Sequence, residues 1–413
     1  MLSGFGELFG MAASEKISVA LCVLIFFWGL FALVCATTWR APWLLVPGLA
    51  LASYGWTFHM GFFNYYLAIG LAFFGVAIGW RGRGWERWLA LAISPLIAMA
   101  HPFGIFFMFP ALAYVLLAER IPSKFQLLLL ASGVGIIALA RVFLEHRYII
   151  EPPSKPFFFF TGADQFVIFG DRYKIIEYAI IALVNGALLV DWWMDRGKPA
   201  TQKHQAIPSQ LYVLVCAGVF FLPRGVRFPG HPAAISLITE RLTTLACATT
   251  VCLLGAMTPR KWHFAASFAV AALFFTFLYQ DTAVVNNIEG QAEQLVRTLP
   301  RDHRVLATIE GLSGYRVSIE HVIDEACIGY CFNYGNYEPG SQVFRVRAED
   351  DNPYVLSSYD DATDTEEGNY VIQPQDLPVS QVFQCDDTGK KLCIRALAAG
   401  EENDRTGLSR RDN

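Results

Sequence analysis

The sequence predicts a mainly α fold, in which a polytopic bundle of about ten transmembrane helices precedes a small α+β extracytoplasmic domain. Its residues are 54% hydrophobic and only 16% charged, whereas soluble domains carry about 25% charged residues. Residues 17–279 are a near-continuous series of apolar runs separated by short basic loops, and residues 280–413 are polar. Because lipid offers backbone groups no hydrogen-bond partners, the apolar runs are expected to be helical.

The charge is divided in the same way. Residues 1–279 hold 20 Lys and Arg against 12 Asp and Glu, and residues 280–413 hold 12 against 24. An acidic C-terminal part argues against nucleic acid as a partner. The lipid bilayer is the partner that the composition predicts.

The apolar residues fall into ten segments: Ile17–Ala36, Trp43–Tyr54, Tyr65–Trp80, Trp88–Ala100, Phe103–Ala118, Phe125–Phe143, Ile175–Met194, Leu211–Leu222, Ala234–Met257 and Phe264–Tyr279. A full span needs about 20 residues. Three segments reach only about 20 Å at 1.5 Å per residue, namely Trp43–Tyr54, Trp88–Ala100 and Leu211–Leu222. We expect these three to be tilted, re-entrant or broken around a wet cavity.

Basic residues orient the segments. If every segment crosses, one side carries Arg40, Arg81, Arg83, Arg87, Arg120, Lys124, Arg196, Lys198, Lys203, Arg260 and Lys261. The positive-inside rule assigns that side to the cytoplasm. Ten crossings then place both termini outside, with residues 1–16 as an N-terminal extracytoplasmic segment that lacks the features of a cleavable signal peptide. The predicted transmembrane domain is 17–279, with a long outer loop at 144–174.

The polar C-terminal part predicts a soluble domain over 280–399. Gln291–Leu299 has the pattern of an amphipathic helix that extends back toward the last span through Val284, Val285 and Ile288 and ends before Pro300. Strands are expected at Arg304–Ile309, Arg316–Ile323, Gln342–Arg347, Tyr370–Ile372 and Gln381–Phe383. Residues Ala348–Gly368 are predicted to be a mobile acidic loop, and 400–413 a disordered tail.

Four cysteines lie in this C-terminal domain, whereas the other five lie within or beside apolar runs. An even number in a domain placed outside the cell predicts two disulfides. The simplest pairing joins Cys327 to Cys331 and Cys385 to Cys393. A zinc site made of the four thiolates is the alternative, although the spacings are poor for a zinc ribbon or finger.

The segment Cys327–Pro339 is rich in Tyr, Phe and Asn. One interpretation is an aromatic surface that faces a sugar or peptide. The other is a disulfide-pinned turn whose aromatic residues pack in the ordinary way.

Polar residues in the membrane part gather at the predicted outer ends of helices. The histidine, tyrosine and asparagine residues among them are His59, Asn64, Tyr65, Tyr66, His101 and His231. The charged residues are Glu145, Arg224, Arg227, Glu240 and Arg241. Ionisable residues in membrane segments are costly and usually functional. Together these groups suit a lipid-linked phosphate or pyrophosphate whose head group lies outside.

Each residue type suggests a role. Arg224, Arg227 and Arg241 are candidates for phosphate contact, because the guanidinium fork matches phosphate oxygens. Glu145 or Glu240 is a candidate base, and His59 or His101 would orient an acceptor or bind a divalent metal ion. Asn64, Tyr65 and His231 are candidates for acceptor or sugar contact.

These residues also have ordinary structural interpretations. Tyr at helix ends commonly anchors the interface, and a single His there is commonly a hydrogen-bonded turn residue. Glu240 and Arg241 are neighbours in sequence, so they do not share a helix face.

The long outer loop contains Lys155–Arg172, which is too polar to span and strongly aromatic. One interpretation is a short amphipathic helix in the interface, with Asp164 and Asp171 facing water near the head groups. The other is a loop folded over the helical bundle.

The chain resembles bacterial multi-span glycosyltransferases of the GT-C class. The resemblance lies in W-x-F-x-x-G-F-x-N-Y at Trp56–Tyr65, the following His101-Pro102, the aromatic juxtamembrane loop and the soluble outer C-terminal domain. It implies transfer of a sugar from a polyprenyl-phosphate donor to an envelope acceptor on the outer face of a bacterial inner membrane. The class usually carries its catalytic acid in the first outer loop, after the first span. Here only Glu7 and Glu15 precede the first apolar run, so the chain is expected to lack an N-terminal part of the family pattern.

Three functions therefore follow from the sequence. The first is a GT-C-like glycosyltransferase, whole or incomplete, that uses a polyprenyl-phosphate-linked sugar. The second is a non-catalytic membrane protein whose outer domain binds envelope glycan or a partner protein. The third is a transporter of a lipid-linked substrate, although such proteins normally show internal repeats, and none is evident.

Overall fold

The computed structural model describes residues 2–152, 160–194, 202–229, 234–257, 260–309, 311–312, 315, 319, 321–334 and 359–404. The chain forms two compact units. One comprises Met1–Ile168, Arg172–Pro229 and Ala234–Phe275, and the other comprises Phe169–Asp171, Gly230–Ala233 and Thr276–Asn413. The first unit is helical and carries the apolar segments, and the second contains a sheet.

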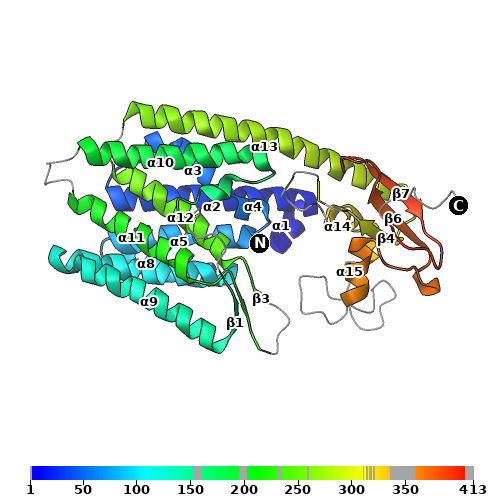
Figure 1. The fold of residues 1–413 in the computed structure, drawn as a ribbon, viewed down its shortest axis with the longest axis horizontal. Coiled ribbons are helices and arrows are strands. Elements are labelled where there is room, and N and C mark those ends of the chain that lie inside the picture. The colour runs from blue at the N-terminus through cyan, green and yellow to red at the C-terminus, as the bar shows by residue number, and fades with distance from the viewer. Residues whose placement is uncertain are drawn as a thin grey trace. The chain divides into compact units, whose positions relative to one another are not determined.

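Long helices in the first unit run roughly parallel or antiparallel to one another (Figure 1). Its helices and 3-10 turns are α1 (Leu2–Phe9), α2 (Met11–Thr38), η1 (Trp43–Leu45), α3 (Val46–Ala52), α4 (Trp56–His59), α5 (Phe63–Arg81), α6 (Glu86–Ala92), α7 (Ser94–Ala100), α8 (Pro102–Arg120), η2 (Ser123–Phe125), α9 (Gln126–Arg147), η4 (Ala163–Phe166), η5 (Asp171–Tyr173), α10 (Lys174–Met194), α11 (Gln202–Phe221), α12 (Ile238–Ala256) and the first part of α13 (Lys261–Val296). The short strands are β1 (Ile149–Glu151), β2 (Gly225–Arg227) and β3 (Ala234–Ile235).

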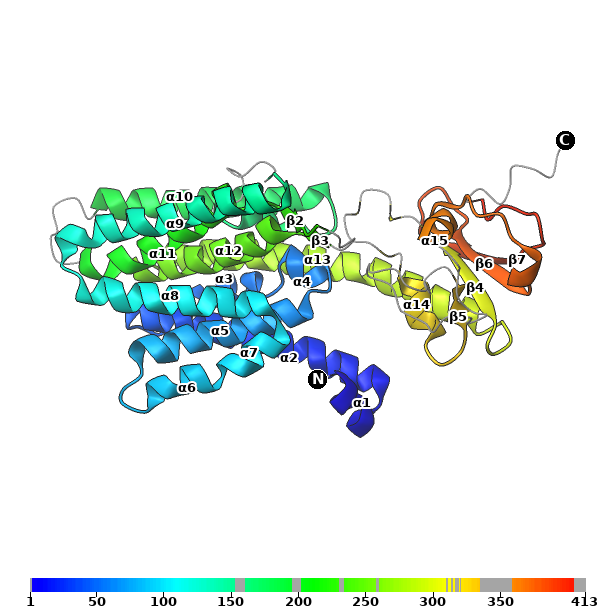
Figure 2. The same ribbon diagram turned by 90° about the horizontal axis from the view of Figure 1, so that it is seen from below.

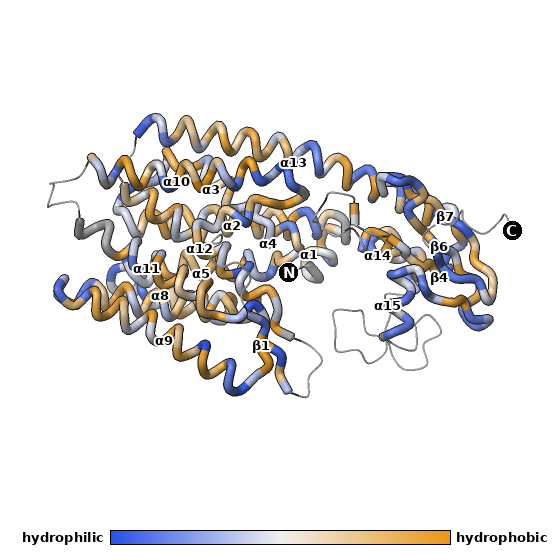
Figure 3. Tube along the Cα trace, in the orientation of Figure 1, coloured by the Kyte–Doolittle hydropathy of each residue, from blue (hydrophilic) through white to orange (hydrophobic). Residues whose placement is uncertain are grey.

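The protein is a multi-span membrane protein. Six helical stretches in the described part of the chain are long and apolar enough to cross a bilayer: Ala13–Thr38, Phe63–Arg81, Pro102–Arg120, Ser123–Arg147, Asp171–Asp191 and Lys261–Val296. Hydrophobic residues dominate the middle of these helices, and hydrophilic residues lie toward many of their ends (Figure 3). Each of the six coincides with one of the ten apolar segments of the sequence.

The other four segments are short or interrupted. Trp43–Tyr54 becomes η1 and α3, which together cover only ten residues, Trp43–Ala52. Trp88–Ala100 is divided between α6 and α7, and Pro95 lies in the first turn of α7, where its missing N–H is tolerated. The segment Leu211–Leu222 starts later than the helix to which it belongs, because α11 begins at Gln202. The fourth segment, Ala234–Met257, begins in β3 and continues as α12, which starts at Ile238.

Two glycines let α2 and α5 pack at close range. A Cβ added to Gly70 would lie 2.7 Å from backbone atoms of Phe26, and one added to Gly29 would lie 2.2 Å from the carbonyl oxygen of Gly70. The Phe26 ring also contacts Tyr66 and Phe73 of α5, with centroids 4.5 and 5.5 Å apart. Small residues are the usual means by which membrane helices bring their backbones together.

The helical unit has two distinct ends. Strands β1, β2 and β3 form an antiparallel sheet at one end, and the connections from α8 to α9 and from α12 to α13 lie at the other (Figures 1 and 2). At this second end Arg81 donates to the carbonyl oxygen of Ala36 and forms an ion pair with Glu119. Arg40 and Arg260 line one cavity there. Three of the basic residues in the predicted cytoplasmic loops, Arg40, Arg81 and Arg260, therefore lie at this end.

The second unit contains a four-stranded mixed sheet in the order β5-β4-β6-β7. Strand β4 (Arg304–Thr308) pairs in parallel with β5 (Phe332–Asn333) and with β6 (Val379–Gln384), and β6 pairs antiparallel with β7 (Leu392–Ala396). Helices α14 (Val322–Cys327) and α15 (Tyr359–Glu367), the 3-10 turn η7 (Pro374–Asp376) and the last part of α13 complete the described elements.

Both faces of this sheet are buried. Val305 and Val382 pack in a cluster that includes Ile288 and Ala292 of α13. Leu306, the next residue along β4, belongs to a different cluster, because successive strand residues point to opposite faces. The continuation of the last apolar helix into an amphipathic helix that ends before Pro300 is thereby confirmed.

Both predicted disulfides form. Cys327 pairs with Cys331, and Cys385 pairs with Cys393, so the four thiols are not available for the zinc site considered above. In the described part of the aromatic segment, the Tyr330 hydroxyl donates to the carbonyl oxygen of Leu299 at 2.6 Å. The Tyr334 hydroxyl donates to buried Asp376 at 2.8 Å. These contacts match the interpretation of a disulfide-pinned turn with packing aromatics.

The expected strands have mixed outcomes. Arg304–Ile309 and Gln381–Phe383 correspond to β4 and β6, and Val371 makes an isolated bridge to Glu402. The expectation of a strand across Arg316–Ile323 is wrong at its end, because α14 begins at Val322 and a helix occupies those residues. Gln342–Arg347 lies outside the described residues.

Two stretches that were expected to be mobile or disordered contain ordered residues. Residues 359–367 of the proposed mobile loop form α15. Asn403, in the proposed disordered tail, is completely buried, and its side-chain amide donates to Thr308 Oγ1 and the Thr365 carbonyl oxygen. Local composition did not predict the order of these residues, because the residues that they contact are distant in sequence.

Replacement of Gly70 by Ala is expected to destabilise the protein by about 1–3 kcal/mol, because the new methyl group would overlap the backbone of α2. Thermal unfolding of the purified protein in detergent measures the effect. Gly186→Ala on α10 is the matched control, since open space surrounds that position; its melting temperature should be unchanged or slightly higher. Equal melting temperatures for the two variants would contradict the close approach.

Candidate functional site

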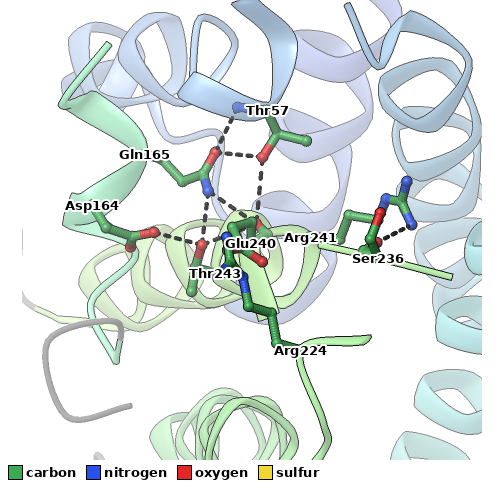
Figure 4. A network of polar contacts seen from close by, with 8 residues as sticks. All are labelled: Thr57, Asp164, Gln165, Arg224, Ser236, Glu240, Arg241 and Thr243. Atoms are coloured by element: carbon green, nitrogen blue, oxygen red, sulfur yellow. Dashed lines mark hydrogen bonds and ion pairs between the residues drawn. The ribbon is translucent and has the colours of Figure 1, made fainter. Parts of the chain in front are cut away.

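A buried glutamine connects three separate segments at the end of the helical unit that carries β1–β3 (Figure 4). Gln165 of η4 is only 2% exposed. Its side-chain oxygen accepts hydrogen bonds from the Thr57 backbone N–H at 3.2 Å and the Thr57 hydroxyl at 2.8 Å. Its side-chain nitrogen donates to the Glu240 carbonyl oxygen at 2.9 Å and to Thr243 Oγ1 at 2.7 Å. All the hydrogen-bonding capacity of this amide is used.

The loop that carries Gln165 packs against α12 through a glycine. Gly162 has φ of 68°, and an added Cβ would lie 2.4 Å from the backbone nitrogen of Cys247. Only glycine satisfies both requirements at low energy. Residues 162–168 are almost entirely buried, so this part of Lys155–Arg172 is a loop folded over the bundle.

Asp164 is the clearest departure from expectation in this loop. The interfacial-helix interpretation placed it in water, but its Oδ2 accepts a hydrogen bond from Thr243 Oγ1 at 2.8 Å. Its Oδ1 is buried and has no hydrogen-bond partner among the described residues. Burial raises the pKa of Asp164 to about 7; the Thr243 hydrogen bond lowers it and the nearby Glu177 charge raises it.

Arg224 and Glu240 form an ion pair beside this network. Arg224 Nε lies 2.9 Å from Glu240 Oε1. Glu240 lies in the first turn of α12, where a negative charge interacts favourably with the helix dipole. Its second oxygen, Oε2, is buried and has no hydrogen-bond partner in the described part of the chain.

Arg241 points to a different group of residues. Its guanidinium carbon lies 4.7 Å from the centroid of the Phe62 ring, and Nη1 donates to the Ser236 carbonyl oxygen at 3.1 Å. The Tyr65 hydroxyl donates to the Arg241 carbonyl oxygen at 2.6 Å. Nε of Arg241 is buried, and within the described residues it has no acceptor. The Arg241 guanidinium therefore still has an N–H donor that could bond a ligand.

His101 completes this second group. It caps the N-terminus of α8, where its Nδ1 accepts from the Phe103 N–H at 3.1 Å. This bond assigns the ring proton to Nε2 in the neutral imidazole. The ring stands 5.8 Å from that of Tyr65. Burial and then the charge of Arg241 lower the pKa of His101 below its ordinary value.

The candidates from the sequence thus separate into sets. Arg241, Tyr65 and His101 come together, and Arg224 pairs with Glu240. Glu145 is exposed and interacts with Arg141 one turn earlier on α9, at 3.5 Å. Arg227 is exposed on β2, opposite Ile149 of β1. No contact recorded for the described residues links Glu145 or Arg227 to the other two sets.

The remaining candidate residues either belong to neither set or lie outside the described residues. His59 is half-buried at the end of α4, and burial lowers its pKa to about 4, so it is neutral at neutral pH. Asn64 is exposed, and its side-chain oxygen accepts from the Tyr65 N–H. His231 lies outside the described residues. Within the described part, no three His, Cys, Asp or Glu residues are grouped so that they could hold a metal ion.

Sequence reasoning missed Thr57, Gln165 and Thr243. A signal was present, because Gln165 stands in a strongly aromatic and apolar run and α12 contains five threonines among its apolar residues. A polar group in such surroundings needs a hydrogen-bond partner, although the sequence does not say which one.

Asp164 predicts a pH dependence of stability. Its pKa is about 7 in the folded chain against an ordinary value of 3.8, so the folded state binds the proton more tightly. Stability is therefore greatest below the ordinary value and declines as pH rises toward 7, by at most about 4 kcal/mol. Asp164→Asn, which stays neutral, should flatten this decline.

Melting temperatures measured from about pH 4.5 to about pH 8 test this assignment. Glu145→Gln, which removes an exposed carboxylate, is the control and should keep the slope of the wild-type protein. An unchanged slope in Asp164→Asn would show that another group carries the dependence.

Comparison with known proteins identifies no family for the chain. No protein-family model matches it, and neither a curated protein nor a solved structure is significantly similar to it. What stands is a membrane protein with six candidate spans, followed by a small mixed sheet with two disulfides.

Proposed function

We propose that this protein binds the phosphate of a lipid-linked sugar beside Arg241 and transfers the sugar to an acceptor, as a GT-C-like glycosyltransferase does. One observation carries the proposal. The Arg241 guanidinium is held against Phe62 with a buried, unsatisfied Nε, next to Tyr65 and His101. An arginine fixed by packing, with donors still free, is suited to a phosphate ligand.

The comparison with Arg224 supports this choice. Arg224 is already neutralised by Glu240 at 2.9 Å, so a phosphate would have to displace a carboxylate. Among the described residues, the Arg241 side chain donates one hydrogen bond, to the neutral Ser236 carbonyl oxygen, and this bond does not compensate its charge. His101 adds an N–H donor when Nδ1 is occupied by the Phe103 amide.

The position of the site along the membrane-spanning helices suits a lipid substrate. Two candidate spans, Phe63–Arg81 and Pro102–Arg120, begin at this end of the unit, directly after Phe62 and His101. A phosphate at the ends of spanning helices would lie at the head-group level, with its lipid chain in the bilayer. We place this end outside the cell, because basic connections mark the opposite end and the last span leads to a disulfide-bearing domain.

The transfer requires one base. The acceptor oxygen would bond to the anomeric carbon, the bond from that carbon to the phosphate oxygen would break, and the lipid phosphate would leave. The proton of the acceptor hydroxyl would pass to a carboxylate. Glu240 is our candidate, because one of its oxygens is held by Arg224 and the other is unsatisfied.

Arg241→Ala is expected to weaken binding of a short polyprenyl-phosphate analogue by about 10- to 100-fold, since hydrogen bonds to a charged group are lost. Arg241→Lys keeps the charge but loses the forked guanidinium. Its affinity should lie between those of the wild-type protein and Arg241→Ala. Titration of the purified protein with the analogue gives the dissociation constants. Arg227→Ala changes an exposed residue of β2 and should bind the analogue as the wild-type protein does. Equal losses of affinity in Arg227→Ala and Arg241→Ala would show that Arg241 makes no specific contact with the phosphate.

Glu240→Gln separates binding from transfer. It should keep the affinity for the lipid phosphate within a few-fold and reduce sugar transfer about 100- to 10,000-fold. Mass spectrometry of the acceptor after incubation with a lipid-linked sugar measures transfer. Tight binding by a wild-type protein that transfers no sugar would instead identify a non-catalytic binding protein, and unaffected transfer in Glu240→Gln would exclude this residue as the base.

A further inference from the structure

We infer that the basic end of the helical unit binds an anionic phospholipid in a groove between α2, α5 and α6. The groove has a volume of about 790 Å³ and is open on one side. Its apolar lining includes Phe31, Ala77 and Leu89, and its exposed lining residues include Trp39, Arg40 and Trp85, which we take as the mouth. Figure 2 shows α6 beside α5 at the margin of the unit. This inference does not depend on the proposed sugar transfer, which concerns the opposite end.

The two arginines at the groove differ in their charge state. Arg81 is stacked on Trp39 and Trp80, at 4.0 and 4.1 Å from the ring centroids, and is paired with Glu119 at 2.7 Å. Its charge is therefore compensated. Arg40 is exposed, and among the described residues its side chain has no recorded hydrogen bond or ion pair.

An acidic residue, Glu86, also lines the groove. Glu86 Oε2 accepts a hydrogen bond from the backbone N–H of Arg83 at 2.8 Å. This bond leaves the negative charge of Glu86 in place, so a preference for anionic lipid rests on Arg40 together with Arg260, which lines an adjacent cavity. A groove with an apolar wall and a cation at its mouth has the chemistry of an acyl chain joined to an anionic head group.

The backbone at the mouth holds an unfavourable conformation. Trp39 caps α2 with φ of 58°, a left-handed conformation that residues other than glycine seldom adopt. Its N–H donates to the Cys35 carbonyl oxygen, and the Thr38 hydroxyl accepts from the Arg40 N–H. Trp39 is 61% exposed, and it directly follows a candidate span that ends at Thr38, where tryptophan commonly contacts lipid head groups. Such conformations persist where the surroundings enforce them and often mark binding sites.

A second cavity extends the cationic surface. It has a volume of about 240 Å³, shares Arg40 with the groove, and is also lined by Trp43 and Arg260. A phosphate beside Arg40 would therefore have a second arginine in the neighbouring cavity. The bilayer supplies the occupant, because the groove lies in a membrane-spanning unit, and the charge selects anionic over zwitterionic lipid.

The test uses the full chain, purified in detergent and freed of lipid. Phosphatidylglycerol is expected to raise its melting temperature, whereas phosphatidylcholine and inorganic phosphate should not do so to the same extent. Arg40→Gln should lower the affinity for phosphatidylglycerol about five-fold, which is the effect of one interfacial cation. Native mass spectrometry should show phosphatidylglycerol retained by the wild-type protein and reduced in Arg40→Gln.

Arg83→Gln is the matched control. It removes a charge at the same end of the unit from a residue that does not line the groove, so its lipid affinity should equal that of the wild-type protein. Equal stabilisation by phosphatidylglycerol and phosphatidylcholine would overturn the inference. So would an equal effect of inorganic phosphate, which would indicate a site for a simple anion, or an equal loss in both variants.

Discussion

The side-chain amide of Gln165 is the interaction on which the end of the helical unit that carries β1–β3 depends. It satisfies groups of α4 and α12 at once. In a low-dielectric interior, an unpaired amide or carbonyl is strongly unfavourable. The network therefore fixes where α12 begins, and that position determines where Glu240 and Arg241 point from consecutive residues of one helix turn.

Consecutive positions give these two residues different surroundings. Glu240 faces Arg224 and the glutamine network, and Arg241 faces Phe62 and the aromatic group around His101. The same contrast recurs at the other end, where Arg81 is neutralised and Arg40 is not. Each end of the unit thus has an arginine paired with a glutamate and another for which the described residues show no ion pair.

Much of the fold was predictable, because lipid restricts the backbone to helices and leaves a continuous apolar signal. The disulfide pairs were predictable from short spacing within a small domain. The grouping of Arg241 with Tyr65 and His101 was predicted as a common outer face. The separation of Glu145 and Arg227 from that group was not, because loop position does not determine which neighbours a helix end meets. Gln165 escaped detection because its partners lie 75 to 108 residues away.

Asn403 has a consequence for biosynthesis. Its side chain donates to Thr308 of β4, and its carbonyl oxygen accepts from Gln381 of β6. Both strands emerge from the ribosome before Asn403, yet until it arrives the inward-facing groups of Thr308 and Gln381 lack these partners. The sheet can consequently acquire its final set of hydrogen bonds only after Asn403 has been synthesised, about 100 residues after the end of α13.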